Sequence, residues 1–108
     1  MYREYLILFD ILEYCFNNNS NDLDLPPFLG EISPYLWDGG MPIDCSVYDD
    51  WLEISRHINN HHELIDAIIE LLELYEKSFS FDFCETKKVL RHIPSELLEE
   101  LSTKYTDV

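Results

Sequence analysis

The stretch HHELIDAIIELLELYEKSF, residues 61–79, decides the fold of this 108-residue chain. At about 100° per residue, as in an α-helix, its charged side chains fall on one narrow stripe, and apolar side chains cover nearly all of the remaining surface. The stripe contains Glu63, Asp66, Glu70, Glu73 and Lys77. A helix this apolar has to be packed on several sides, so the sequence predicts a central helix. Taken by itself, its charged stripe fits an ordinary solvated helix face.

Helical patterns on both sides of this stretch predict a compact bundle of about five helices. Asn60 followed by Glu63 is a capping-box pattern that starts the central helix, and Pro94 separates the last two helices. The predicted helices cover residues 2–16, 45–58, 61–79, 83–92 and 95–105. Sustained alternation of period two does not occur in the sequence, which argues against β-strands. The predicted fold is therefore all-α, with a single α-helical domain over residues 1–108.

Residues 22–37 contain two adjacent prolines and a third one, Pro34. A residue before proline is pushed out of the α conformation, so residues 22–27 are expected to be extended. One or two helical turns are expected within residues 28–37, with Pro34 in the first turn and Ser33 as the cap. This short piece is the least regular element of the predicted bundle.

Negative charge is the strongest feature of the composition. The chain has 22 Asp and Glu against 7 Lys and Arg, a formal net charge of −15. The first 55 residues hold 11 of these acids and one base, Arg3, so this half is the more anionic. Such a chain repels nucleic-acid phosphates and anionic lipid headgroups, which disfavours direct binding to nucleic acid or to a membrane. Its expected partners are basic proteins.

Three cysteines, Cys15, Cys45 and Cys84, are far apart and odd in number. They fit neither a disulfide framework nor a zinc ribbon, and we expect buried free thiols in a reducing cytosol. The apolar N-terminus is interrupted by Glu4 and Asp10, which argues against a signal peptide, and no apolar run has the length of a membrane span. The expected protein is cytoplasmic and complete.

Three histidines, His57, His61 and His62, lie near many carboxylates. Their spacing would place His57 and His61 on one helical face, but Asn59 and Asn60 are expected to break the helix between them. We therefore expect no metal and no other cofactor, and interpret these residues as surface histidines. The sequence also has no nucleophile elbow, phosphate-binding loop or dinucleotide motif, which favours a protein that is not an enzyme.

Binding through acidic side chains is the function class that remains. The first group predicted to contact a partner is Trp37, Asp38, Asp44, Tyr48, Asp49, Asp50 and Glu53, and the second is the stripe Glu63, Asp66, Glu70 and Glu73. Clusters of like charge oppose folding by repulsion, so an excess beyond the needs of solubility favours a functional reason. The simpler alternative is an acidic protein whose charge serves solubility alone.

Three segments together resemble a known family. Residues 35–44, YLWDGGMPID, and 48–52, YDDWL, followed by the apolar and acidic helix of 65–75, resemble the small bacterial immunity proteins of contact-dependent growth inhibition systems. The resemblance implies a cytoplasmic protein that binds one cognate toxin domain, often a nuclease, and blocks its active site. It carries no functional residues over, because immunity proteins use different surfaces, and it identifies neither the member nor the toxin.

The leading hypothesis is an immunity protein whose acidic surface occludes the active site of a basic toxin, an RNase or a DNase. The alternative is an acidic adaptor or nucleic-acid mimic that binds basic host proteins. Lys77 is expected to pair with Glu73, so residues 61–79 serve as the scaffold and residues 37–53 as the recognition segment. The sequence leaves open which face is used, the oligomeric state, and whether the basic patch of Lys87, Lys88 and Arg91 pairs with an acidic face of the same molecule.

Overall fold

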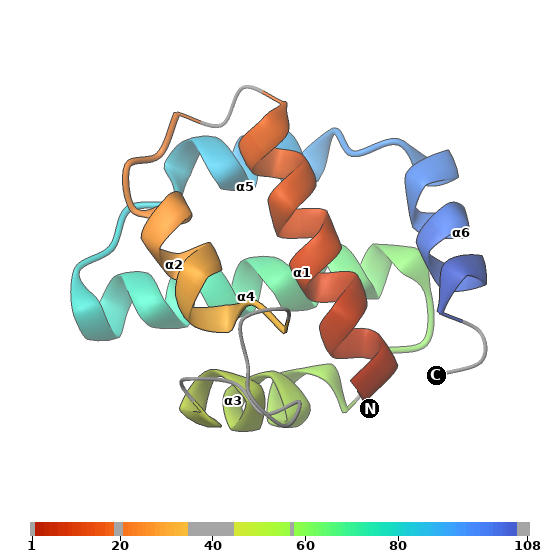
Figure 1. The fold of residues 1–108 in the computed structure, drawn as a ribbon, viewed down its shortest axis with the longest axis horizontal. Helices are drawn as coiled ribbons and strands as arrows, with labels where there is room; N and C mark the ends of the chain where they lie inside the picture. Colours follow the sequence, from red (N-terminus) through yellow and green to blue (C-terminus); the bar gives the residue numbers. More distant parts are fainter. Residues whose placement is uncertain (1, 19–20, 35–44, 57, 106–108) are drawn as a thin grey trace.

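The computed structural model describes residues 2–18, 21–34, 45–56 and 58–105. This part of the chain is built from six α-helices and has no β-strand, which confirms the predicted all-α class (Figure 1). The helices are α1 (Tyr2–Asn17), α2 (Leu25–Ile32), α3 (Cys45–Ser55), α4 (His61–Phe79), α5 (Cys84–Arg91) and α6 (Ser95–Lys104). The predicted number of about five was slightly low. None of the described helices has the length and the apolar composition that a membrane span requires.

Helix α1 shares the centre of the bundle with α4. It packs against α2, α3, α5 and α6, whereas α4 packs mainly against α3 and α5 and meets α2 through the rings of Tyr75 and Phe28. Figure 1 shows α1 running steeply across α4, with α2 and α6 on opposite sides of it. The fully buried side chains of the common core include Tyr5, Leu8, Ile11, Leu12, Phe28, Trp51, Ile68, Leu71, Leu72 and Phe83. The packing centre that the sequence assigned to residues 61–79 is therefore divided between two crossing helices.

Local signals fix both ends of α4 where the sequence predicts them. The Asn60 side chain accepts a hydrogen bond from the Glu63 N–H at 2.9 Å, and the Glu63 carboxylate accepts one from the Asn59 N–H at 2.6 Å. At the other end Ser80 is left-handed, with φ of 60°, and its N–H donates to the Glu76 carbonyl at 3.1 Å. Backbone groups that a helix leaves without partners at its ends are thus satisfied. Glu63, although part of the predicted stripe, is engaged as a capping residue.

Helix α2 overturns the expectation that residues 22–27 are extended. It begins at Leu25, and Pro26 and Pro27 occupy its first turn. Proline is favourable there, because the first N–H groups of a helix have no partner inside it and the ring already restricts φ to helical values. The helix buries Leu25, Phe28, Leu29 and Ile32. This burial outweighs the preference of the residue before proline for an extended backbone. Ser33 ends α2 in an extended conformation and does not start a helix.

The two cysteines whose side chains are described are free thiols in different environments. Cys15 is fully buried in α1, and burial raises the pKa of its thiol to about 12, so it stays protonated at neutral pH. Cys84 is exposed at the first position of α5, because this helix turns Thr86 and Leu90 inward. The expectation of buried thiols is therefore wrong for Cys84. The side chain of Cys45 lies outside the described part of the chain.

Candidate functional site

Most Lys and Arg side chains form ion pairs with carboxylates of the same molecule. All seven Lys and Arg residues lie in the described part of the chain, and five of them form ion pairs. The pairs are Arg3 with Glu4 at 3.2 Å, Arg56 with Glu53 at 3.0 Å, Lys87 with Glu76 at 2.6 Å and Glu73 at 3.5 Å, Lys88 with Glu85 at 3.3 Å, and Lys104 with Asp10 at 3.3 Å. Lys77 and Arg91 have no ion-pair partner among the described residues. Glu73 therefore pairs with Lys87 and not, as expected, with Lys77.

One group of carboxylates holds the start of α5 in place. Asp22 accepts hydrogen bonds from the Glu85 N–H at 3.2 Å and from the N–H and the hydroxyl of Thr86, both at 2.7 Å. Thr86 is fully buried, so these bonds satisfy polar groups that water does not reach. Three further carboxylates accept backbone N–H groups nearby: Asp24 from Asp82 at 2.8 Å, Glu76 from Phe83 at 2.8 Å, and Asp82 from Cys84 at 2.9 Å. We call Asp22, Asp24, Glu76 and Asp82 the structural carboxylates.

The predicted acidic side chains of α3 point in two different directions. Asp49 and Glu53 are exposed. Asp50 is half-buried and faces α4, where its carboxylate accepts a hydrogen bond from the Tyr75 hydroxyl at 2.6 Å. Neighbouring helix positions diverge by about 100°, which is why Asp49 and Asp50 cannot serve the same surface equally. Asp50 therefore has a role inside the fold, and the outward charge of α3 comes from Asp49 and Glu53.

The other residues of the first predicted group contribute less to what the structure describes. Trp37, Asp38 and Asp44 lie outside the described residues, so their role stays a prediction. Tyr48 is half-buried, and its ring centroid lies 5.1 Å from that of Tyr5 in a tilted arrangement. The ring thus packs between α3 and α1, which limits the area that Tyr48 offers to a partner.

A shallow groove of about 340 Å³ lies between α3 and α4, along the second predicted group. One wall carries Glu63, Asp66 and Glu70 of α4, and the other carries Ile54 of α3 and Ile58 just after it. Asp66 and Glu70 are exposed, and Glu70 has no ion-pair partner in the described part. Together, the exposed carboxylates of the two helices form what we call the α3–α4 face, made up of Asp49, Glu53, Asp66 and Glu70.

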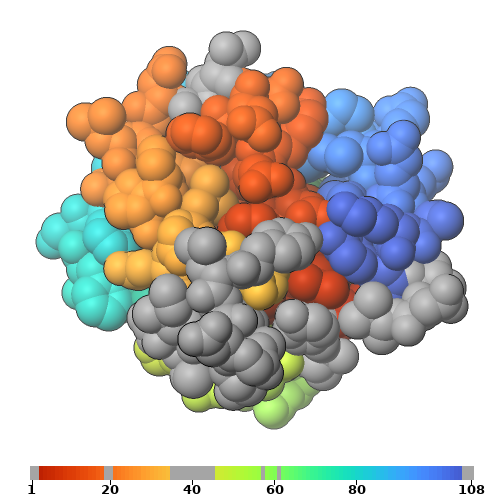
Figure 2. Space-filling model, viewed as in Figure 1, coloured from red at the N-terminus to blue at the C-terminus, as the bar shows by residue number. Residues whose placement is uncertain are grey.

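Helix α6 carries a further acidic group that the sequence interpretation did not single out. Glu96, Glu99 and Glu100 are exposed and lack an ion-pair partner within the described residues. This helix, blue in Figure 2, forms one edge of the molecule and packs against α1. The spacing of the three residues places them on one side of a helix, but such a pattern is also that of a plain solvated face. They provide a comparison group for the α3–α4 face.

Within the described residues, no three His, Cys, Asp or Glu side chains are placed to hold a metal ion, while His57 and the side chain of His61 lie outside the described part. No family model, curated protein or solved structure matches the chain. Exposed carboxylates, on the α3–α4 face and on α6, are the groups that the described surface offers to a partner.

Proposed function

We propose that this protein is a cytoplasmic immunity protein that binds a basic toxin domain, a nuclease, through its α3–α4 face. The observation that carries the proposal is that all four carboxylates of this face stay exposed, and that two of them have no ion-pair partner among the described residues. Asp49 and Glu70 are exposed without an ion-pair partner among the described residues. The side chains of Glu53 and Asp66 are 71% and 64% exposed, although Glu53 pairs with Arg56 and Asp66 lies 3.4 Å from the His62 imidazole. The resemblance of residues 35–75 to immunity proteins supports the same assignment.

A nuclease is complementary to this acidic face, because its active site binds phosphates through Lys and Arg side chains. Carboxylates on a rigid helix pair can occupy the positions of those phosphates, and the opposite charges steer the two proteins together. Truncation of one central carboxylate leaves its partner cation buried and unpaired, which costs about 2 to 5 kcal/mol of binding free energy. The groove supplies the apolar share of the interface through Ile54 and Ile58.

Charge reversal on the two acidic faces tests the proposal with a matched control. The first variant is Asp49→Lys, Glu53→Lys and Glu70→Lys, which leaves the Asp50 hydrogen bond intact. The control is Glu96→Lys, Glu99→Lys and Glu100→Lys, which changes the net charge by the same amount on α6. We expect the first variant to weaken binding of the toxin domain encoded by the neighbouring gene by at least about 100-fold, and the control by less than about threefold at physiological salt.

Affinity is measured by calorimetry, and protection is scored as survival of cells that co-express toxin and variant. Equal losses in the two variants would show that overall charge, and not the α3–α4 face, governs binding. A larger loss of affinity in the α6 variant would show that the toxin binds at α6. A neighbouring gene that encodes no toxin would contradict the immunity function itself and favour an acidic adaptor that binds other basic proteins.

A further inference from the structure

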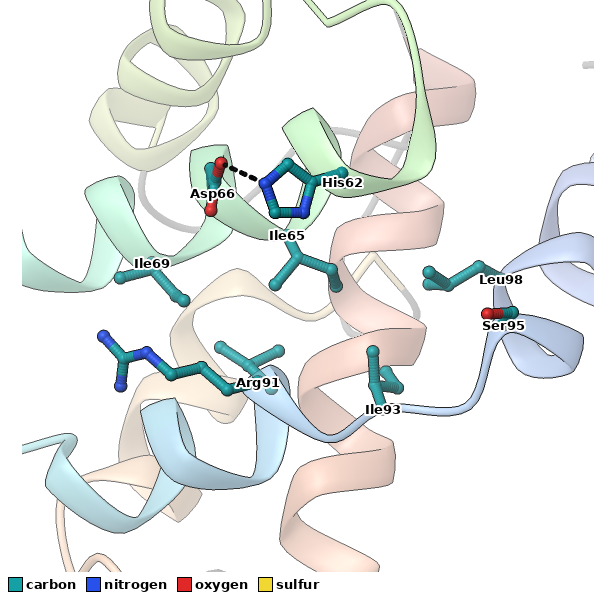
Figure 3. A pocket seen from close by; sticks show the side chains of 9 residues that line it. His62, Ile65, Asp66, Ile69, Arg91, Ile93, Ser95 and Leu98 are labelled. Carbon is teal, nitrogen blue, oxygen red and sulfur yellow. Dashed lines mark ion pairs between the residues drawn. The ribbon is translucent and has the colours of Figure 1, made fainter.

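A pocket of about 480 Å³ opens between α4, α5 and α6 (Figure 3) and shares only Asp66 with the groove between α3 and α4. Its apolar lining consists of Ile65, Ile69, Leu90, Ile93 and Leu98. Ile65 and Ile69 come from α4, Leu98 comes from α6, and Ile93 lies in the connection before α6. Figure 3 shows Arg91 at one end of the pocket and Ser95 with Leu98 at the other. This volume is within the range of small-molecule sites in proteins.

The rim of the pocket carries an arginine, which is rare in a chain with so few basic residues. On the α4 side, the His62 imidazole and the Asp66 carboxylate pair with each other at 3.4 Å. Across from them stands Arg91, a pocket-lining cation without an ion-pair partner in the described residues, in a chain with 22 Asp and Glu. Arg91 lies in the last turn of α5, where a positive charge stabilises the end of the helix. This stabilisation does not explain why Arg91 also lines a pocket.

We infer that this pocket binds a small aliphatic carboxylate. Its hydrocarbon tail lies on Ile65, Ile69 and Leu98, and its carboxylate forms a bidentate pair with the Arg91 guanidinium. Arginine presents two parallel N–H donors that match a carboxylate, and the aliphatic side chains suit a hydrocarbon tail. The Asp66 carboxylate, which also lines the pocket, is paired with His62. The pocket meets the α3–α4 face only at Asp66, so the inference does not depend on the proposed function.

Three probes with the same tail and different headgroups test the chemistry: octanoate, 1-octanol and octylammonium. Binding to the full-length protein is measured by calorimetry, and the site is located by chemical-shift changes in amide NMR spectra. We expect octanoate to bind tightest, with the largest shifts at residues around Ile65, Arg91 and Leu98. If the overall negative charge governed binding, octylammonium would bind tightest, and that order would overturn the inference. Equal affinity for octanoate and octanol would overturn it as well.

Two single substitutions separate Arg91 from a general effect of charge. Arg91→Gln and Lys77→Gln each remove one cation that has no ion-pair partner among the described residues, but Lys77 does not line the pocket. We expect Arg91→Gln to weaken octanoate binding roughly tenfold and to leave octanol binding unchanged, while Lys77→Gln changes neither. Ser95→Phe, at the exposed first position of α6, fills the pocket and should abolish binding of all three probes. Equal effects of the two glutamine variants, or undiminished binding to the Ser95→Phe variant, would contradict the assignment.

Discussion

The structural carboxylates and those of the α3–α4 face are the same chemical groups in opposite situations. Asp22, Asp24, Glu76 and Asp82 each accept at least one backbone N–H around the loop from α4 to α5. By contrast, Asp49 and Glu70 point to solvent without an ion-pair partner among the described residues. A net charge of −15 is therefore the sum of two populations, and the composition alone does not separate them.

The difference determines the sign of each group's effect on stability. A carboxylate that accepts N–H donors stabilises the fold, because its removal leaves those donors unsatisfied. A carboxylate that faces only water and other carboxylates destabilises the fold slightly through repulsion. Acids of the second kind persist at a small cost in stability, which the proposed binding of a basic partner would explain.

The largest expected effect is the loss of Asp22. Replacement by alanine removes the acceptor for the Glu85 and Thr86 N–H groups and for the Thr86 hydroxyl. We expect Asp22→Ala to lower the free energy of unfolding by about 2 to 3 kcal/mol in urea denaturation. The matched control Asp49→Ala, which removes the same charge from the α3–α4 face, should change it by less than about 0.5 kcal/mol. Similar losses in both variants would erase the distinction between the two populations.

The sequence predicted the helices better than it predicted which acids are free. The ends of α4 follow from local signals such as Asn60 and Glu63, which act within one helical turn. The start of α2 was missed because two local rules conflict at Pro26 and Pro27, and burial in the tertiary structure decides between them.

The role of an individual carboxylate depends on contacts that are distant in sequence. Asp22 bonds Thr86, which is 64 positions away, and Asp50 bonds Tyr75, which is 25 positions away. Periodicity shows which side of a helix an acid occupies, but it does not show what lies opposite to it. For this reason the sequence does not distinguish Asp49 from Asp50 as binding residues, whereas the packing of α3 against α4 does.

Lys87 is expected to give an intermediate effect, because it pairs with the structural carboxylate Glu76 and with Glu73 of the stripe. Its hydrogen bond to Glu76 raises the pKa of Lys87 above the ordinary value of 10.5. A raised pKa means that the folded protein holds this proton more tightly than the unfolded chain does. The resulting stability is complete below about pH 10.5 and is lost as the pH rises through the folded-state pKa.

We therefore expect Lys87→Met to lower the free energy of unfolding by about 1 kcal/mol at neutral pH. The difference from the natural protein should shrink above about pH 10.5 and vanish at higher pH, as measured by urea denaturation across this range. Lys77→Met, which removes an unpaired lysine from α4, is the control and should show no such convergence. A constant difference at all pH values would mean that Lys87 stabilises through packing of its hydrocarbon stem.

The smallest effect, and the one of opposite sign, comes from neutralising the α3–α4 face. Asp49→Asn with Glu70→Gln removes two charges without ion-pair partners in the described part of a strongly anionic protein. The free energy of unfolding should therefore rise by about 0.3 to 0.5 kcal/mol at low ionic strength. The gain should disappear near 1 M salt, where the screening length falls to about 3 Å. Lys77→Gln makes the net charge more negative and should shift stability in the other direction. A double variant that loses stability at low salt would show that Asp49 and Glu70 have favourable interactions within the fold, and the surface would then no longer stand out as one retained for a partner.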